Sequence, residues 1–258
     1  MRFFIFFIAM MLSVFSSSVF AAMYGSTLCK EEGFHCLKIH GGQSWRSLWP
    51  DPHDRDIVMR VNRMNTGLYP GLRIAVPDNV EEADIMDFSP FPAQTDSSGE
   101  KLIIVDPITR AWGAYDEAGS LVRWGPVSAG ADWCRDIDEA CHTHPGSYRI
   151  FTLGSSSCYS TKFPLPDGGA PMPYCMYFHN GQALHGEPNG LPGYNASHGC
   201  VRLYVNDAEW LRYDFVSGPS AENSYRGTRV VIKPYETPEP SDDNNDENRR
   251  VDENDESY

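Results

Sequence analysis

Two neighbouring stretches decide how this chain is interpreted: Ala183-Leu184-His185-Gly186 and, after a short loop, Ala196-Ser197-His198-Gly199-Cys200-Val201-Arg202-Leu203. They bring a cysteine, two histidines, a serine and an arginine close together in sequence. A thiol is a useful nucleophile only as its thiolate, and an ordinary cysteine titrates at about 8.5, so Cys200 needs a nearby base. His185 or His198 can supply that base, and the pattern therefore predicts a nucleophilic cysteine site.

The residues beside Cys200 strengthen this prediction. Gly199 has no Cβ, so the backbone can approach a reacting group closely, and the N–H groups of Gly199 and Cys200 could point at a developing oxyanion. If Cys200 opens a strand, Arg202 lies on the same face, where it could hold a substrate carboxylate. The alternative is that Cys200 is a buried structural cysteine with incidental histidines nearby.

The order His-Gly, loop, Ser-His-Gly-Cys-Val-Arg-Leu resembles the signature of the L,D-transpeptidases, the YkuD-like catalytic domain of bacterial cell-wall enzymes. The resemblance implies that Cys200 is the nucleophile and that His185 is the general base, oriented by the backbone carbonyl of Gly186. It places His198 and Gly199 in the oxyanion pocket. The substrate-binding candidates are Ser197, Arg202 and Gly186. The loop between the two motifs, residues 187–195, is shorter than in many members and carries two prolines, which indicates a trimmed substrate loop.

Residues 101–235 carry many short apolar stretches separated by turns rich in glycine and proline, which is typical of an antiparallel-rich sandwich or barrel. The clearest predicted strands are residues 101–106, 110–115, 174–178, 182–185 and 228–233. One helix is expected from Asn206 to Phe215, with Asn206 as its cap. The resemblance implies a mainly β fold, the YkuD-like β-sandwich, with the site in a groove at one side.

Residues 23–80 are expected to form a small α/β domain in the order strand, helix, helix, strand. This order resembles a LysM module, on the phrases Gly-Gln-Ser-Trp and Asn-Arg-Met-Asn-Thr-Gly-Leu-Tyr-Pro-Gly-Leu-Arg-Ile-Ala-Val-Pro. LysM modules bind glycans that contain N-acetylglucosamine, so the resemblance makes Trp45 a glycan-binding candidate. The alternative is that Trp45 and Trp49 form the core of a small disulfide-tied domain.

Residues 1–22 are typical of an export signal. Arg2 precedes an apolar run from Phe3 to Phe15, and Val19-Phe20-Ala21 is a tolerable cleavage site. An uncleaved anchor helix is the alternative, although the run is short of the roughly 20 apolar residues that a membrane span needs. No later segment is expected to cross a membrane, so we expect a periplasmic or wall-associated protein.

The seven cysteines also favour an oxidising compartment. Proximity makes three pairs the disulfide candidates, although other connectivities are allowed: Cys29 with Cys36, Cys134 with Cys141, and Cys158 with Cys175. Cys200 is left over and is a candidate reactive thiol. A metal site on Cys134, Cys141, His142 and His144 is an alternative, but the spacing matches no standard zinc pattern. We expect neither a metal nor a cofactor.

The remaining segments differ in composition from the two domains. Residues 81–100 show no hydrophobic periodicity and are expected to be a linker. Residues 236–258 hold ten acidic residues and two arginines, which gives −8 of the formal net charge of −14. This segment has almost nothing apolar, so it is predicted to be a disordered, solubilising tail. The acidic balance argues against nucleic-acid binding.

These features together predict an exported cysteine acyltransferase that acts on peptidoglycan. The resemblance implies that Cys200 attacks a diaminoacyl carbonyl in a stem peptide, releases D-alanine and passes the acyl group to an amine. It also implies that a carbapenem acylates Cys200. With water as acceptor the enzyme is an L,D-carboxypeptidase or endopeptidase. A papain-like protease is disfavoured, because there the cysteine precedes the histidine. The remaining alternative is a glycan-binding or host-interaction surface protein with a vestigial catalytic domain.

Overall fold

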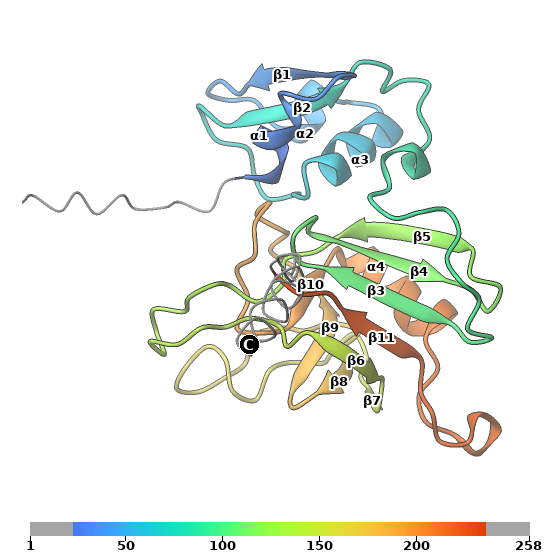
Figure 1. The fold of residues 1–258 in the computed structure, drawn as a ribbon. Helices are drawn as coiled ribbons and strands as arrows, with labels where there is room; N and C mark the ends of the chain where they lie inside the picture. The colour runs from blue at the N-terminus through green and yellow to red at the C-terminus, as the bar shows by residue number, and fades with distance from the viewer. Residues whose placement is uncertain (1–22, 236–258) are drawn as a thin grey trace, which may run out of the picture.

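The computed structural model describes residues 23–235 (Figure 1). The predicted export signal, residues 1–22, and the predicted acidic tail, residues 236–258, lie outside the described residues. Within residues 23–235, no helix has the length and apolar character that a membrane crossing requires. The described chain folds into an N-terminal module, residues 23–80, and a larger C-terminal part, residues 101–235.

The C-terminal part is built on two β-sheets. Its strands are β3 (Leu102–Asp106), β4 (Ala111–Tyr115), β5 (Leu121–Pro126), β6 (Gly146–Arg149), β7 (Thr152–Leu153), β8 (Met176–His179), β9 (Gln182–Gly186), β10 (Val201–Leu203) and β11 (Arg229–Ile232). The larger sheet has the order β5-β4-β3-β11-β6, and the smaller has the order β10-β9-β8-β7 (Figure 1). Strand β11 is parallel to β3, and β10 is parallel to β9. The prediction of a mainly β sandwich is therefore confirmed.

The core between the sheets consists of apolar side chains that point inward from both. Ile103 and Val105 of β3 belong to the same buried cluster as Met176 of β8 and Leu184 of β9, and Trp112 of β4 is fully buried among them. Alternate residues of a strand point to one face, so each sheet contributes every second residue to this core. The burial of these side chains holds the two sheets together.

The predicted helix at residues 206–215 begins one residue earlier than expected. Helix α4 (Val205–Trp210) continues into η2 (Leu211–Phe215), and its N-cap residue is Tyr204, without a side-chain cap. The prediction of Asn206 as the cap was wrong. The Tyr204 hydroxyl donates to the Met64 carbonyl of the N-terminal module at 3.0 Å, so a contact between distant segments fixes Tyr204 at this helix end.

The N-terminal module has the predicted strand, helix, helix, strand order. Its elements are α1 (Tyr24–Leu28), β1 (Phe34–Lys38), α2 (Trp45–Leu48), α3 (Pro52–Val61) and β2 (Arg73–Pro77). The sequence did not predict α1. Strands β1 and β2 pair antiparallel, and Ser44 caps α2 with a reciprocal capping box. The module has a buried cluster of its own that includes Trp45, Val58 and Ile74.

Residues 81–100 join the two units, and they are packed chain rather than a free linker. The segment contains η1 (Ile85–Phe88), and Phe91 packs with Tyr115 and Trp124 on the large sheet. The Trp124 indole N–H donates to the Ile85 carbonyl at 2.8 Å. The large sheet is thus covered on its outer face too. Single aromatic residues separated by prolines show no helical or strand periodicity, so the sequence pattern did not predict this packing.

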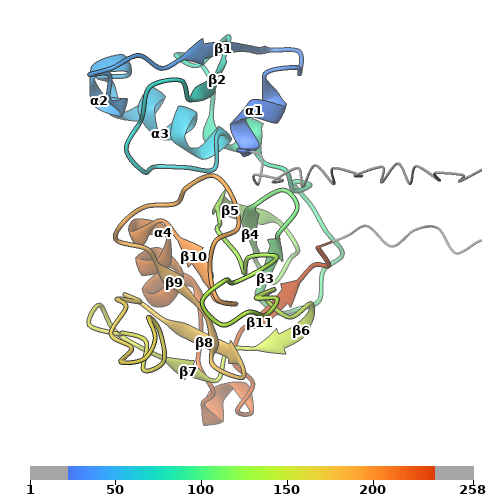
Figure 2. The same ribbon diagram turned by 90° about the vertical axis from the view of Figure 1, so that its left-hand side faces the viewer.

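A buried ion pair fixes the module to the C-terminal part, and Figure 2 shows the module stacked against the sandwich. Arg60 of α3 donates to both Asp207 oxygens at 2.8 and 3.0 Å, and Arg123 of β5 adds a third bond at 2.7 Å. Asp207 is fully buried. A Cβ at Gly125 would lie 2.5 Å from Asp207 Oδ2, so glycine is required there. A buried carboxylate is tolerated only when it is paired, so this contact depends on both arginines.

We predict that Asp207→Ala lowers the free energy of unfolding by about 3–5 kcal/mol, because it leaves Arg60 buried without its main partner. Urea unfolding of the full chain measures this change. Asp214→Ala is the control, since Asp214 is exposed on η2 and should change stability by less than about 0.5 kcal/mol. Equal, small changes in both variants would show that the Asp207 pair contributes little.

Candidate active site

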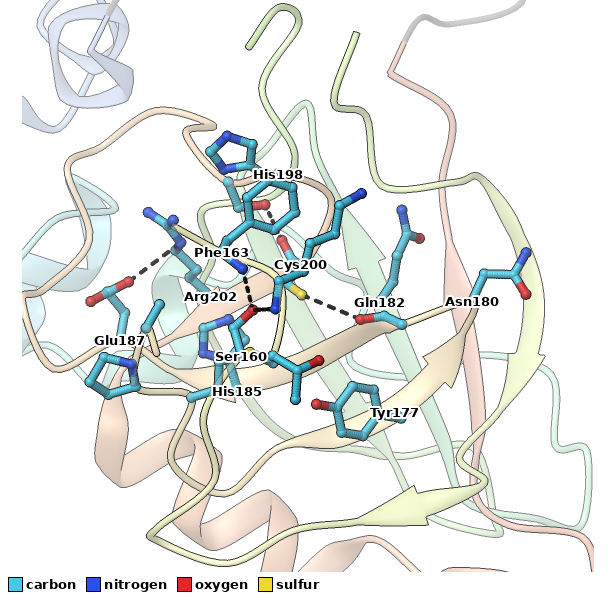
Figure 3. Close-up of a pocket in the computed structure, with 17 residues that line it drawn as sticks. Ser160, Phe163, Tyr177, Asn180, Gln182, His185, Glu187, His198, Cys200 and Arg202 are labelled. Atoms are coloured by element: carbon cyan, nitrogen blue, oxygen red, sulfur yellow. Dashed lines mark hydrogen bonds and ion pairs between the residues drawn. The ribbon is translucent and has the colours of Figure 1, made fainter. Parts of the chain in front are cut away.

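Strand pairing brings the key side chains of the two sequence motifs to one face. β9 and β10 run parallel, with His185 directly opposite Arg202. Cys200 immediately precedes β10, and residues two apart on an extended chain share a face. Cys200, Arg202 and His185 accordingly line the same pocket (Figure 3). The predicted residues come together through a ladder of only three aligned pairs.

His185 is arranged as a neutral base. The residue is only 4% exposed, and its Nδ1 lies 2.8 Å from the Gly186 carbonyl oxygen. A donor at Nδ1 leaves the lone pair on Nε2. Burial lowers the pKa of His185 to about 4, with a smaller lowering by Arg202, against the raising effect of the Gly186 carbonyl. The ring is therefore uncharged at neutral pH.

Cys200 is the free thiol of the chain. The other six cysteines form the disulfides Cys29–Cys36, Cys134–Cys141 and Cys158–Cys175. Burial raises the pKa of Cys200, although a backbone hydrogen bond at Ala183 and the charge of Arg202 act in the opposite direction. The resting pocket therefore holds a neutral thiol, whose Sγ lies 3.9 Å from the Gly181 carbonyl oxygen, and a neutral imidazole. In this arrangement His185 is the group that can take the thiol proton, which would be general-base activation of a nucleophile.

The turn before Cys200 is stabilised by hydrogen bonds to the Ser197 hydroxyl. Gly199 has a φ of +110°, and a Cβ there would lie 2.7 Å from Gln182 Nε2. The Gly199 N–H donates to Ser197 Oγ at 3.1 Å, and the Ser197 hydroxyl donates to the Cys200 carbonyl. Of the two backbone donors predicted for the oxyanion, the one on Gly199 is thus bound to Ser197. Ser197, predicted to bind substrate, is 1% exposed and stabilises this turn.

His198 lies between two loops that disulfides close. Its Nε2 is 2.8 Å from Asp136 Oδ2, in the loop closed by Cys134–Cys141. Its ring stacks on Phe163, in the loop closed by Cys158–Cys175, with 4.2 Å between the ring centroids. The hydrogen bond from His198 lowers the pKa of Asp136. His198 therefore forms a wall of the pocket, and its Nε2 is engaged away from the thiol.

The groups considered as a metal site make other contacts. Cys134 and Cys141 are joined in a disulfide, so neither sulfur is available as a thiolate ligand. His142 stacks on Tyr235 at 3.8 Å between ring centroids, and His144 Nδ1 lies 3.0 Å from Gln182 Nε2. Of the four, His144 contacts the pocket through Gln182, which lines it.

Three further residues of the pocket were missed by sequence reasoning: Lys162, Tyr177 and Glu187. Glu187 Oε2 lies 3.4 Å from Arg202 Nε, so the predicted carboxylate-binding arginine already has an anionic neighbour. Burial raises the pKa of Tyr177, and the nearby Cys200 raises it further; Figure 3 shows the Tyr177 hydroxyl directed into the pocket. Lys162 lies in a loop that no motif marks. Glu187 opens the loop between the two motifs, although nothing in the sequence singled it out within that loop, and only its strand position could have indicated Tyr177.

Trp45, the predicted glycan-binding residue, lies outside this pocket. It is 7% exposed, and its indole N–H donates to the Thr66 carbonyl at 2.7 Å. Its ring packs 5.6 Å from that of Trp49. This placement favours the alternative in which both tryptophans belong to the core of the module.

Known proteins were compared with the chain at the levels of sequence and structure. The profile of the YkuD family, the L,D-transpeptidase catalytic domain, matches residues 100–232. The search of curated proteins returned no match. The structure is similar to residues 123–326 of an L,D-transpeptidase from Xylanimonas cellulosilytica, with 25% identity, a TM-score of 0.46, and coverage of 64% of this chain and 73% of that one.

Two other solved structures are more distant. One is an L,D-transpeptidase (Yku) from Stackebrandtia nassauensis, with 22% identity, a TM-score of 0.43, and coverage of 57% of this chain and 61% of that chain. The other is L,D-transpeptidase 3 from Mycobacterium tuberculosis in complex with a faropenem-derived adduct. It shows 18% identity, a TM-score of 0.41, and coverage of 65% of this chain and 75% of that chain.

We predict that acylation of Cys200 by a carbapenem is lost only as the pH falls through about 4, the lowered pKa of His185. The ring must be unprotonated to accept the thiol proton, so a solvated histidine would lose activity near about 6.5 instead. Intact-mass measurement of the acylation rate between about pH 3.5 and 8 gives the profile. Circular dichroism must show folded protein throughout, because protonation of the unfolded chain below about 6.5 also reduces stability.

The two histidines serve as matched variants in this experiment. His185→Ala should slow acylation by about 10²–10⁴-fold and remove the acid limb, as expected for the loss of a general base. His198→Ala should slow acylation through the pocket wall and leave the limb in place. If His185→Ala keeps the wild-type profile while His198→Ala loses it, the base is His198.

Proposed function

The chain belongs to the YkuD family of L,D-transpeptidase catalytic domains, and we propose that it is an exported enzyme that cross-links or remodels peptidoglycan through a thioester on Cys200. The observation that carries the proposal is the placement of Cys200, His185 and Arg202 on one face of the β9–β10 pair, inside one pocket. This arrangement supplies a nucleophile, a neutral base and a cation for a substrate carboxylate.

The acylation step uses the neutral pair. His185 Nε2 takes the proton of the Cys200 thiol as the sulfur attacks the diaminoacyl carbonyl of a stem peptide. The new C–S bond forms, the C–N bond to the terminal D-alanine breaks, and the proton passes from His185 to the departing amine. The backbone N–H of Cys200 and the hydroxyl of Tyr177 are the proposed donors to the oxyanion.

The second step restores the thiol. An amine of another stem peptide attacks the thioester and His185 takes its extra proton. The C–S bond then breaks, and His185 returns that proton to the sulfur of Cys200. The pocket offers both charge signs, with Lys162 and Arg202 positive and Glu187 negative. A diaminoacyl residue of the diaminopimelate type carries an ammonium group and a carboxylate on one carbon, so this lining suits it.

Export is part of the proposal. Three disulfides in a chain of this length are typical of an oxidising compartment. The apolar leader at residues 1–22 supplies the signal for it. The proposed location is the periplasm or the cell wall, where the substrate lies.

We predict that the purified protein changes the muropeptides of isolated sacculi and that Cys200→Ala changes none. Mass analysis of the digested sacculi makes the comparison. New cross-linked dimers identify a transpeptidase. Shortened monomers without new cross-links identify an L,D-carboxypeptidase, and loss of existing cross-links identifies an endopeptidase. If wild type and Cys200→Ala give identical muropeptides, the catalytic proposal fails and a vestigial surface protein remains.

We also propose that the N-terminal module is LysM-like and binds wall glycan. The strand, helix, helix, strand order supports this, and so does a groove on the module that Trp49, Pro50, Asp51, Asp54 and Asn79 help to line. The exposed Pro50 ring, beside the Asp51 and Asp54 carboxylates, can take a sugar by apolar contact and by hydrogen bonds to its hydroxyls. The groove replaces the buried Trp45 as the proposed surface.

We predict that the full-length Cys200→Ala protein pellets with glycan strands from which the stem peptides have been removed. Asp54→Ala should reduce the pelleted fraction, because Asp54 lines the groove. Asp214→Ala, on the exposed side of η2, is the control and should not reduce it. Pelleting with intact sacculi alone would show that binding occurs through the stems and the catalytic pocket.

A further inference from the structure

The substrate loop, residues 187–195, docks on the N-terminal module. The Asn65 N–H donates to the Leu191 carbonyl at 3.0 Å, and the Leu191 N–H donates to Asn65 Oδ1 at 2.6 Å. Met64 and Pro192 form an isolated antiparallel bridge beside this pair. Figure 2 shows the loop, in orange, passing directly beneath the module. The loop between α3 and β2 therefore meets the middle of the substrate loop with paired hydrogen bonds.

The backbone conformation of the substrate loop and of the module is suited to this contact. Gly190 and Gly193 have φ values of +83° and +86°, a region that favours glycine. A Cβ at Gly190 would lie 2.8 Å from Asn65 Oδ1. The Tyr24 N–H donates to the Gly193 carbonyl at 3.1 Å, and Leu191 is fully buried. The two segments approach so closely at Gly190 that a larger residue would clash with Asn65, which makes the docking specific.

The start of the substrate loop reaches the active site. The Glu187 N–H donates to the Leu203 carbonyl at 2.9 Å, and the Gly190 N–H donates to the Glu187 carbonyl at 3.0 Å. Asn189 donates to Glu187 Oε1 from its backbone N–H and from Nδ2, both at 3.1 Å. The other carboxylate oxygen faces Arg202 at 3.4 Å. The turn thus fixes the carboxylate that lies beside the proposed substrate-binding arginine.

We propose that Asn65 is a positioning residue for substrate binding: the module holds the substrate loop so that Glu187 orients Arg202 in the pocket. The inference rests on the proposed function. A free loop loses conformational entropy when a ligand orders it, and that cost weakens binding. An anchor at Leu191 orders the loop beforehand. The module then contributes to catalysis as a fixed support, in addition to any binding of glycan.

The kinetic test compares Asn65→Ala, Asn65→Asp and Tyr204→Phe in the full chain, with carbapenem acylation followed by intact mass. Asn65→Ala should raise the carbapenem concentration for half-maximal rate by about 10-fold, because the loop must be ordered on binding. The limiting rate should stay within about 2-fold, since Asn65 contacts neither Cys200 nor His185. Asn65→Asp keeps the acceptor oxygen and should restore the wild-type value.

Tyr204→Phe is the matched control, because it removes a bond between the two units, the one to the Met64 carbonyl, and leaves both Asn65–Leu191 hydrogen bonds in place. It should leave both kinetic values unchanged. Equal effects of Asn65→Ala and Tyr204→Phe, or no effect of Asn65→Ala, would overturn the positioning role. If the wild-type protein is not acylated at all, the proposed function fails separately, and hydrogen exchange decides the positioning role.

Hydrogen–deuterium exchange measures the order of the substrate loop and does not require acylation of the protein. In Asn65→Ala, the amides of Glu187 and Gly190 should exchange at least about 5-fold faster than in wild type, since their bonds depend on an anchored loop. Asn65→Asp and Tyr204→Phe should show wild-type exchange there. Unchanged exchange at Glu187 in Asn65→Ala shows that the turn holds itself, which also overturns the inference.

Discussion

The parallel pairing of β10 with β9 is the constraint on which the site depends. The side chains of a strand alternate between faces, so a slip of one residue would turn His185 away from Arg202 and Cys200. Three aligned pairs are a short ladder, and β10 is secured on its other side as well. Ser128 and Arg202 exchange backbone hydrogen bonds of 3.0 Å in both directions. The strand that carries the arginine is thus clamped between two partners, and this fixes the register.

The N-terminal module and the two disulfide-closed loops also contact the segments next to β10. The module contacts the substrate loop just before the second motif and, through Arg60 and Asp207, the helix just after it. The two disulfide-closed loops meet over His198 from the opposite direction. A site held from several elements keeps its groups in place before substrate arrives, and this pre-organisation is where enzymes gain much of their rate.

The sequence predicted the features that depend on residues close together along the chain. The Ser44 cap, the alternating strands and the His-Gly and Ser-His-Gly-Cys motifs are local patterns, and the fold and the family followed from them. What was missed depends on contacts between distant segments. Asn206 is not the helix cap, because the hydrogen bond from Tyr204 to the module places the helix end at Tyr204. Residues 81–100 are packed rather than free, because Phe91 packs against the large sheet. Glu187 gains its place from strand pairing and from Asn65, which no local pattern encodes.

The burial of Cys200 has a consequence for its survival in the oxidising compartment that we propose. Oxidants and disulfides react with thiolates, so a raised pKa keeps the resting sulfur largely unreactive toward them. In the oxidising compartment that we propose, where the six other cysteines pair, a free thiol is exposed to oxidation and to capture in a wrong disulfide. The half-buried, protonated sulfur resists both reactions, and in the proposed mechanism it becomes reactive only when His185 removes its proton beside a bound carbonyl. The raised pKa of Cys200 therefore accounts both for its resistance to oxidation and for its low reactivity in the absence of substrate.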